Sequence, residues 1–242
     1  MRQVRFDRGD GPEAGRVEDG TILLEDGEVS TDDVELLPPC EPSKVVCVGR
    51  NYAEHADELG SDVPEFPLLF FKPPSAVVGP FDRIVMPPET DDLHYEGEVG
   101  LVVGEHCRRV DPDDATEVLA GYTAVNDVTM RDWQERESQW ARAKGGDTFC
   151  PIGPYLQTDW EEPLALETRV NGDVRQSAST ADVVFGFDEL VAAASRFMTL
   201  EPGDVIATGT PEGVGAVEPG DVVGVEVEGV GTLRNTVATP DA

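Results

Sequence analysis

Lysine is scarce in this chain of 242 residues, because only Lys44, Lys72 and Lys144 occur among 18 basic residues, against 49 acidic ones. The formal net charge is −31, and the acidic residues are spread from end to end. Such a charge repels the phosphates of nucleic acids and the anionic lipids of a membrane surface. We therefore expect neither nucleic acid nor membranes as partners.

Apolar runs and paired cysteines are also missing. No run approaches the ~20 apolar residues of a membrane span, and the charged N-terminus has no apolar signal-peptide core. The four cysteines form no Cys-x-x-Cys pair, so neither a zinc site nor a disulfide framework is indicated. We expect a cytoplasmic protein.

What the sequence does contain is typical of a folded domain. The hydrophobic content is 39%, with repeated valine-rich runs, whereas a disordered acidic chain would lack both. We interpret the charge as a solvated surface suited to high salt, where self-repulsion is screened over ~3 Å at 1 M. The sequence therefore predicts a protein from a halophile.

The pattern of short strands and few helices predicts an α+β fold. Residues 1–40 are predicted to form a small N-terminal β region, and residues 41–242 the main domain. Acidic residues at its start and a glycine after its end predict one helix over residues 113–120. Apolar spacing predicts another helix over residues 187–198, and Asn171-Gly172 predicts a hairpin turn.

The stretch from His94 to Gly104 reads as one strand, on which Glu96 and Glu98 point the same way because side chains two apart share a face. The apolar run that ends at Asp127 can bring a third carboxylate from a neighbouring strand. Two buried carboxylates side by side require a cation, and three carboxylates suit Mg²⁺ or Mn²⁺. The alternative is a solvated face, since Glu-x-Glu is common on exposed strands.

A His–Glu pair follows the strand that opens the main domain. The segment 53–60 is compatible with a helix, which places His55 and Glu58 on one face. A histidine oriented by a carboxylate can act as a general base near neutral pH. The alternative is an ordinary surface contact between the two side chains.

Lys144 stands beside a Gly-Gly turn and the apolar run Phe149–Ile152. This placement suggests a charge held at a site. The alternative is a lysine whose stem lies over apolar surface while its ammonium reaches water. The glycine-rich stretch around Thr210 is neither a P-loop nor a dinucleotide-binding motif, so nucleotide binding is unsupported.

Six motifs in this order resemble the fumarylacetoacetate hydrolase family, over roughly residues 41–238. They are Val48-Gly49-Arg50-Asn51-Tyr52, Phe71-Lys72-Pro73-Pro74-Ser75, Tyr95-Glu96-Gly97-Glu98, Asn126-Asp127-Val128-Thr129-x-Arg131-Asp132, Lys144-Gly145 with Phe149–Pro154, and Thr208-Gly209-Thr210-Pro211-x-Gly213-Val214-Gly215. The resemblance implies a mixed-β roll of the fumarylacetoacetase C-terminal type with a few helices. It also implies a homodimer and a small oxo-acid substrate.

Carried over residue by residue, the resemblance implies that Glu96, Glu98 and Asp127 bind Mg²⁺ or Mn²⁺. His55 and Glu58 match a His–Glu pair found in the acylpyruvate hydrolase and oxaloacetate decarboxylase branch, on a segment that acts there as a lid. The compact length of the chain also resembles this branch.

Lys144 matches the active-site lysine of the family, and Arg50, Gln134 and Thr210 fall where that branch contacts substrate. A metal that chelates a 2,4-dioxo acid would act as a Lewis acid, and the histidine would activate water for cleavage of a carbon–carbon bond. We predict a Mg²⁺-dependent hydrolase of acylpyruvate-type acids. The alternatives are an oxaloacetate decarboxylase, an isomerase or decarboxylase of unsaturated dicarboxylic oxo-acids, and a non-catalytic oxo-acid binder.

Overall fold

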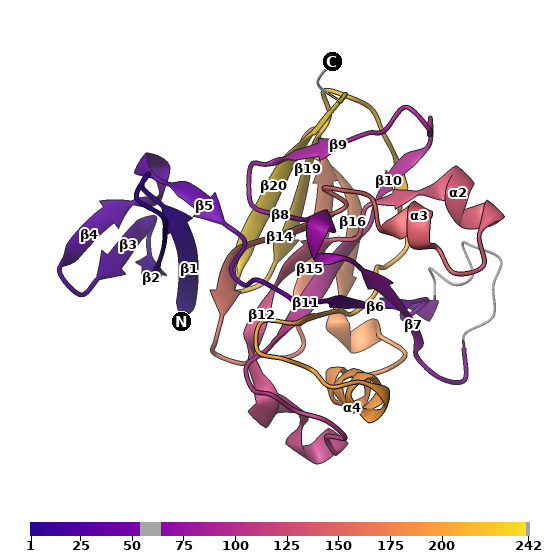
Figure 1. Ribbon diagram of the computed structural model, residues 1–242, viewed down its shortest axis with the longest axis horizontal. Helices are drawn as coiled ribbons and strands as arrows, with labels where there is room; N and C mark the ends of the chain where they lie inside the picture. Colours follow the sequence, from indigo (N-terminus) through magenta and orange to yellow (C-terminus); the bar gives the residue numbers. More distant parts are fainter. Residues whose placement is uncertain (54–63, 241–242) are drawn as a thin grey trace.

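A computed structural model describes residues 1–53 and 64–240 of the chain, and in this part the strands lie in three sheets (Figure 1). The strands of the 12-stranded sheet are β1 Arg2–Asp7, β2 Pro12–Glu18, β3 Thr21–Leu24, β4 Gly27–Ser30, β5 Glu35–Leu37, β6 Val45–Gly49, β7 Leu68–Lys72, β8 Val77–Val78, β11 Gly97–Val103, β12 Leu119–Asn126, β14 Cys150–Gln157 and β17 Val205–Ala207. Their order is β4-β3-β2-β1-β14-β12-β11-β17-β6-β7, while β5 pairs with β1 and β8 with β14.

Two smaller sheets and a few helices complete the described part. The three-stranded sheet has the order β13-β10-β18, formed by Thr129–Met130, Leu93–Tyr95 and Gly215–Val217. The five-stranded sheet has the order β16-β15-β19-β20-β9, formed by Asp173–Ser179, Ala165–Val170, Val222–Val227, Gly231–Ala238 and Arg83–Val85. The helices are α2 Arg131–Arg136, α3 Ala141–Lys144 and α4 Phe187–Phe197, with 3-10 turns η1 Thr31–Asp33, η2 Pro74–Ala76, η3 Pro112–Val118 and η4 Thr180–Asp182. The predicted α+β class is confirmed.

The centre of the large sheet is apolar on both faces. Every residue of β11 is buried, and β11 lies between β12 and β17. Strand β17 then pairs with β6 in the parallel direction, Val205 opposite Val45. Strands covered on both faces read as continuous valine-rich runs, which is the pattern of this chain. The ends of these central strands are therefore held rigidly by the core.

The N-terminal strands β1–β5 project to one side of the main body (Figure 1). They enclose a small core of their own, formed by Val4, Phe6, Val17, Ile22 and Leu36. Strand β1 also continues the large sheet, because Arg2 and Gln3 pair with Gln157 and Leu156 of β14. A division into two domains near residue 40 stays a prediction.

The predicted single strand over residues 94–104 is wrong. Strand β10 ends at Tyr95, β11 begins at Gly97, and the two belong to different sheets. Side-chain carbonyls accept the backbone N–H groups at the break: Glu96 donates to Asn126 Oδ1 and Gly97 to Gln176 Oε1, both at 3.0 Å. A continuous strand would need these N–H groups for its ladder, so the strand ends here.

The predicted helix over residues 113–120 is also only partly right. The structure has the 3-10 turn η3 over Pro112–Val118, and Leu119 already belongs to β12. The carbonyl of Val118 accepts from the N–H of Gly104 at 2.8 Å, and Leu119 pairs with Val103. Because Leu119 pairs with β11, it belongs to strand β12, and the segment does not continue as an α-helix.

The two predictions from the last third of the chain are confirmed. Residues Asn171 and Gly172 join β15 to β16 with φ of 53° and 91°, the positive angles of a tight hairpin turn. Helix α4 spans Phe187–Phe197 and buries its apolar face. No helix in residues 1–53 and 64–240 is long and apolar enough to cross a membrane.

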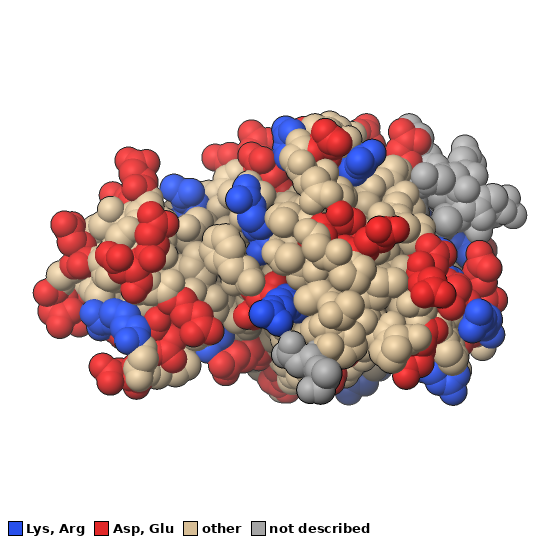
Figure 2. Space-filling model, turned by 90° about the horizontal axis from the view of Figure 1, so that it is seen from above, with Lys and Arg blue, Asp and Glu red and all other residues tan. Residues whose placement is uncertain are grey.

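Acidic side chains outnumber basic ones on the face of the molecule seen in Figure 2. With a net charge of −31, repulsion between these groups grows as salt is diluted. We expect the melting temperature to fall steadily when KCl is lowered from molar to dilute, as measured by circular dichroism. A melting temperature that does not change with KCl would contradict the predicted halophilic origin.

Candidate metal centre and substrate cavity

Three buried carboxylates meet where the central strands end. Glu96 lies at the break between β10 and β11, Glu98 is in β11, and Asp127 directly follows β12. One oxygen from each lies within 4.8 Å of the other two, and the three residues are at most 4% exposed. The pairing of β11 with β12, Gly97 opposite Asn126, brings them together. The structure thus gathers all three residues that the sequence singled out.

Gly97 allows the chain to pass closely against the five-stranded sheet. A Cβ at this position would lie 2.0 Å from Thr168 Oγ1, so no larger residue fits. The carbonyl of Gly97 accepts a hydrogen bond of 2.9 Å from Thr210 Oγ1, which itself accepts from Gln176 Nε2 at 2.8 Å. Thr210, predicted as a substrate contact, therefore uses its hydroxyl to hold the backbone between the two glutamates.

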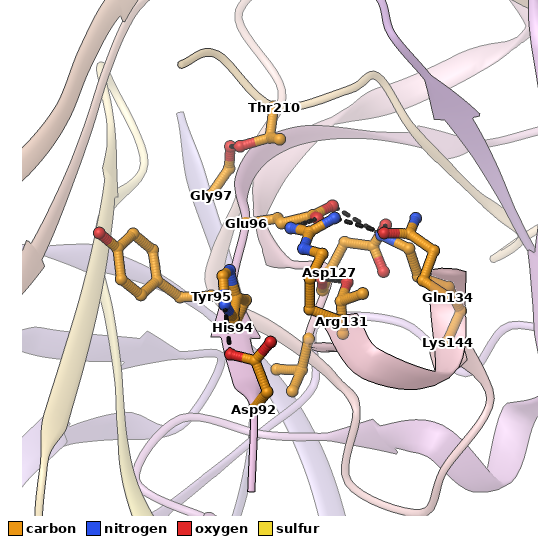
Figure 3. Close-up of polar contacts among 12 residues, drawn as sticks. Asp92, His94, Tyr95, Glu96, Gly97, Asp127, Arg131, Gln134, Lys144 and Thr210 are labelled. Carbon is orange, nitrogen blue, oxygen red and sulfur yellow. Dashed lines mark hydrogen bonds and ion pairs between the residues drawn. The ribbon is translucent and has the colours of Figure 1, made fainter. Parts of the chain in front are cut away.

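Lys144, at the end of α3, lies between two of the carboxylates (Figure 3). Its Nζ donates to Glu96 Oε2 at 2.6 Å and to Asp127 Oδ2 at 2.8 Å. Burial alone lowers the pKa of Lys144, but the carboxylates of Asp127 and Glu96 raise this pKa by more, so it lies above its usual range. Lys144 is 2% exposed and stays charged, which excludes a stem lying over the surface with its ammonium in water.

Lys72, the last residue of β7, is a second buried cation that the sequence analysis did not assign to the site. Its Nζ donates to three backbone carbonyls, those of Val128, Lys144 and Phe149, at 2.6 to 2.9 Å. These bonds use all three protons of the ammonium. Asp127 Oδ1 lies 2.7 Å from the same nitrogen, so Lys72 also forms an ion pair with this carboxylate.

Arg131 is a third buried cation that sequence reasoning passed over. Its Nη2 donates to Glu96 Oε1 at 2.6 Å, and its Nη1 donates to the side-chain carbonyl of Gln134, one turn further along α2 (Figure 3). Gln134 itself lines the cavity over the carboxylates. The spacing of three residues on a helix is the signal that could have linked Arg131 to the predicted substrate contact Gln134.

Glu98 differs from the other two carboxylates because it forms no ion pair with any described residue. Its Oε2 accepts one hydrogen bond, from the N–H of Gly209 at 2.9 Å. Burial, and then the charges of Asp127 and Glu96, raise the pKa of Glu98 well above its usual range. A buried, unpaired carboxylate beside two others is the arrangement that a divalent cation stabilises, so the three residues fit a metal ion.

A cavity of about 240 Å³ lies over these groups. Residues that line it include Arg50, Phe70, Gln134, Trp140, Lys144 and Thr210. Arg50 follows β6 with φ of 59°, a left-handed conformation that is uncommon in residues other than glycine. The cavity therefore joins the predicted substrate contacts to the carboxylates.

The predicted base, His55, and its partner Glu58 lie outside the described residues. The chain has two other histidines, and neither lines the cavity. His94 Nε2 contacts Asp92 Oδ1 at 2.8 Å, and His106 contacts Glu201 on the surface. Neither of these two histidines can therefore act on a molecule bound in the cavity.

Residues 44–238 match the family described as fumarylacetoacetate (FAA) hydrolase C-terminal. The chain belongs to this family, whose members include isomerases, tautomerases and hydrolases.

The names of similar proteins include several of these activities. The chain is 43% identical over 224 residues to oxaloacetate tautomerase YisK of Bacillus subtilis, covering 86% of this chain and 74% of the relative. A structure of 5-carboxymethyl-2-hydroxymuconate delta-isomerase from Mycobacterium smegmatis is 44% identical, with a TM-score of 0.93 and full coverage of both chains. Maleylpyruvate hydrolase from Sphingobium, solved with manganese(II) and pyruvate, is 31% identical, with a TM-score of 0.83 and full coverage of both chains.

Proposed function

We propose that this protein is a Mg²⁺- or Mn²⁺-dependent enzyme that interconverts the keto and enol forms of a dicarboxylic 2-oxo acid, with oxaloacetate as the simplest substrate. The similarity to an oxaloacetate tautomerase and to an isomerase of a hydroxymuconate supports this reaction class. The observation that carries the proposal is the balance of buried charge at the site.

Among the residues that the structure describes, that balance comes from three buried anions and three buried cations. The carboxylates are matched in number by Lys72, Lys144 and Arg131, buried residues that are at most 9% exposed. A divalent cation would therefore leave the centre with two uncompensated positive charges in a buried place. A dicarboxylate compensates both, whereas an acylpyruvate carries one carboxylate. The charge at the site thus favours a dianionic substrate.

The chain's own residues can assist the proton transfer in distinct ways. A metal held by the three carboxylates would supply Lewis-acid polarisation of the keto group. The ammonium of Lys144 and the amide of Gln134 border the cavity and can stabilise negative charge that develops on the substrate oxygen. Arg50 can pair with the distal carboxylate. His55 is our candidate for the base that moves the proton at C3.

Hydrolysis of an acylpyruvate-type acid is the second candidate. The similarity to maleylpyruvate hydrolase favours it, and the pair His55–Glu58 could activate water. Decarboxylation of oxaloacetate passes through the same enolate, so the same charged residues would assist it. These reactions differ in what is released, which makes them separable by experiment.

The test compares three assays on metal-stripped protein before and after Mg²⁺ or Mn²⁺ is restored. We expect rapid loss of the ultraviolet absorbance of enol oxaloacetate, with much less carbon dioxide released from oxaloacetate and pyruvate released from acetylpyruvate. Heat-inactivated protein with the same metal gives the background rate. A higher kcat/KM for acetylpyruvate cleavage than for oxaloacetate tautomerisation would overturn the proposal in favour of hydrolysis.

His55→Ala tests the assigned base. We expect this change to slow tautomerisation, and any acylpyruvate cleavage, by ~10²-fold, in line with general-base contributions. Decarboxylation should suffer less, because the metal alone can stabilise the enolate. Glu58→Gln serves as the companion variant, because it keeps size and hydrogen bonding but removes the charge that favours imidazolium formation. Wild-type rates for Glu58→Gln across pH 6 to 9 would show that the pair is structural.

A further inference from the structure

The loops that follow β6 and β17 meet beside the metal centre. The two strands pair in the parallel direction, so their carboxyl ends lie at the same edge of the large sheet. Strand β6 continues into Arg50 and Asn51, and β17 continues into Thr208 and Gly209. Asn51 and Thr208 are at most 1% exposed. The contacts between these two loops therefore fix how this edge of the sheet faces the carboxylates.

Gly209 connects its loop directly to a candidate metal ligand. Its N–H donates to Glu98 Oε2 at 2.9 Å. Because Glu98 forms no ion pair with any described residue, this hydrogen bond orients its carboxylate. Partners of this kind, which bind a ligand and not the metal, typically change metal affinity by about 10- to 100-fold when they are removed. The position of one backbone N–H therefore matters to the metal centre.

The side chain of Asn51 holds this loop from the neighbouring strand. Its Nδ2 donates at 2.8 Å to the carbonyl of Thr208, the residue directly before Gly209. The same nitrogen donates to the carbonyl of Phe185 at 3.2 Å, and Oδ1 accepts from the N–H of Phe185 at 2.8 Å. Both protons of the amide nitrogen, and the oxygen, are therefore engaged with backbone groups of two other segments.

The backbone around Asn51 is fixed as well. Its carbonyl accepts from the N–H of Val184 at 2.7 Å, and Tyr52 forms an isolated β-bridge with Val183. Gly209 has a φ of 99°, and a Cβ on it would lie 2.7 Å from the Cβ of Asn51. Glycine is required for so close an approach. The N–H of Gly209 therefore cannot shift unless Asn51 moves too.

We propose that Asn51 is a positioning residue for the metal centre, which orients Glu98 through the N–H of Gly209. This role rests on the divalent metal of the proposed function. Asn51 does not line the cavity, so it acts only through the backbone groups that it holds. An amide suits this fully buried place, because it supplies two donors and an acceptor without adding a charge beside three carboxylates.

Asn51→Ala tests this role by calorimetry with Mn²⁺ on the metal-stripped full chain. The change removes the hydrogen bond that holds the carbonyl of Thr208, and the N–H of Gly209 is then free to turn away from Glu98. We expect the Kd for Mn²⁺ to rise by ~10-fold or more. The melting temperature without metal is measured on the same samples, because the change also removes the bonds to Phe185.

Asn235→Ala is the matched control. Asn235 is 2% exposed, and its Nδ2 likewise donates to two backbone carbonyls, those of Gly79 and Asp82, at 2.8 and 2.9 Å. It lies in β20 and does not line the cavity. Because each variant loses two such bonds, the melting temperature should fall in both. The affinity for Mn²⁺ should fall only in Asn51→Ala.

Asn51→Ser is measured in the same way, because it keeps one hydrogen-bonding group and is the milder change if Asn51→Ala does not fold. Its Kd for Mn²⁺ should also exceed that of the wild type. An unchanged Kd in the folded Asn51 variants, or an equal rise in Asn235→Ala, would overturn the role of Asn51 and leave the metal centre standing. A wild type that binds no Mn²⁺ would overturn the metal centre, and this role with it.

Discussion

Replacing Asp127 by asparagine should weaken Mg²⁺ and Mn²⁺ binding by ~100-fold or more, because the charge of the ligands sets the affinity of such sites. Turnover should fall by ~10³-fold, which corresponds to the several kcal/mol that metal-assisted polarisation contributes. Isothermal calorimetry measures the first effect and enol oxaloacetate consumption the second. Metal affinity equal to that of the wild type would contradict the assignment of the carboxylate centre.

Asp127 also contacts Lys72 and Lys144, so its loss can disturb the fold as well as the metal site. Glu98→Gln separates these effects, since Glu98 forms no ion pair with a described residue and should lose metal affinity while keeping its melting temperature. Glu135→Gln is the matched control for charge. It removes one carboxylate from the wall of the same cavity but leaves the three ligands intact. We expect its metal affinity to stay close to that of the wild type.

Replacing Lys72 by methionine should destabilise the protein by about 3–5 kcal/mol, the range seen when one partner of a buried ion pair is removed. The change leaves the carbonyls of Val128, Lys144 and Phe149 without their donor and removes one counter-charge of Asp127. For a chain of this size the melting temperature should fall by about 10 °C. Differential scanning calorimetry with metal removed measures this directly.

The variant Arg175→Met is the control for Lys72→Met. Arg175 is half exposed and lies 3.6 Å from Asp173, a surface pair of the kind that contributes little to stability. Lys72→Arg should not rescue the fold, because a planar guanidinium cannot direct three N–H groups at one cluster of carbonyls as an ammonium does. A Lys72→Met protein that melts within a degree of the wild type would show that the three bonds contribute nothing net.

The sequence was sufficient to predict those site residues that belong to short motifs. Glu96, Glu98 and Asp127 could be grouped from their spacing, although the strand that was expected to carry the two glutamates is broken at Glu96. The two glutamates still lie close together, because the side-chain carbonyls of Asn126 and Gln176 hold the chain at the break without turning the carboxylates away from each other. Burial of Lys144 was likewise one of the two alternatives that its neighbours allowed.

The role of Lys72 could not be predicted from the sequence, because it depends on contacts with residues 56 to 77 positions away. The scarcity of lysine in the chain marked Lys72 as unusual, but no local sequence pattern identifies the carbonyls that accept its hydrogen bonds.

The fit of Gly97 against Thr168 has a consequence for how the chain folds. The backbone that carries the two glutamates is held by Gln176 and Thr210, which lie 79 and 113 residues further along. Contacts this distant in sequence form late, since long loops must close before they are made. In a refolding experiment, metal binding should therefore appear only with the slowest phase, after the C-terminal strands have docked. A bound metal would then stabilise only the completed fold and would not stabilise the early folding intermediates.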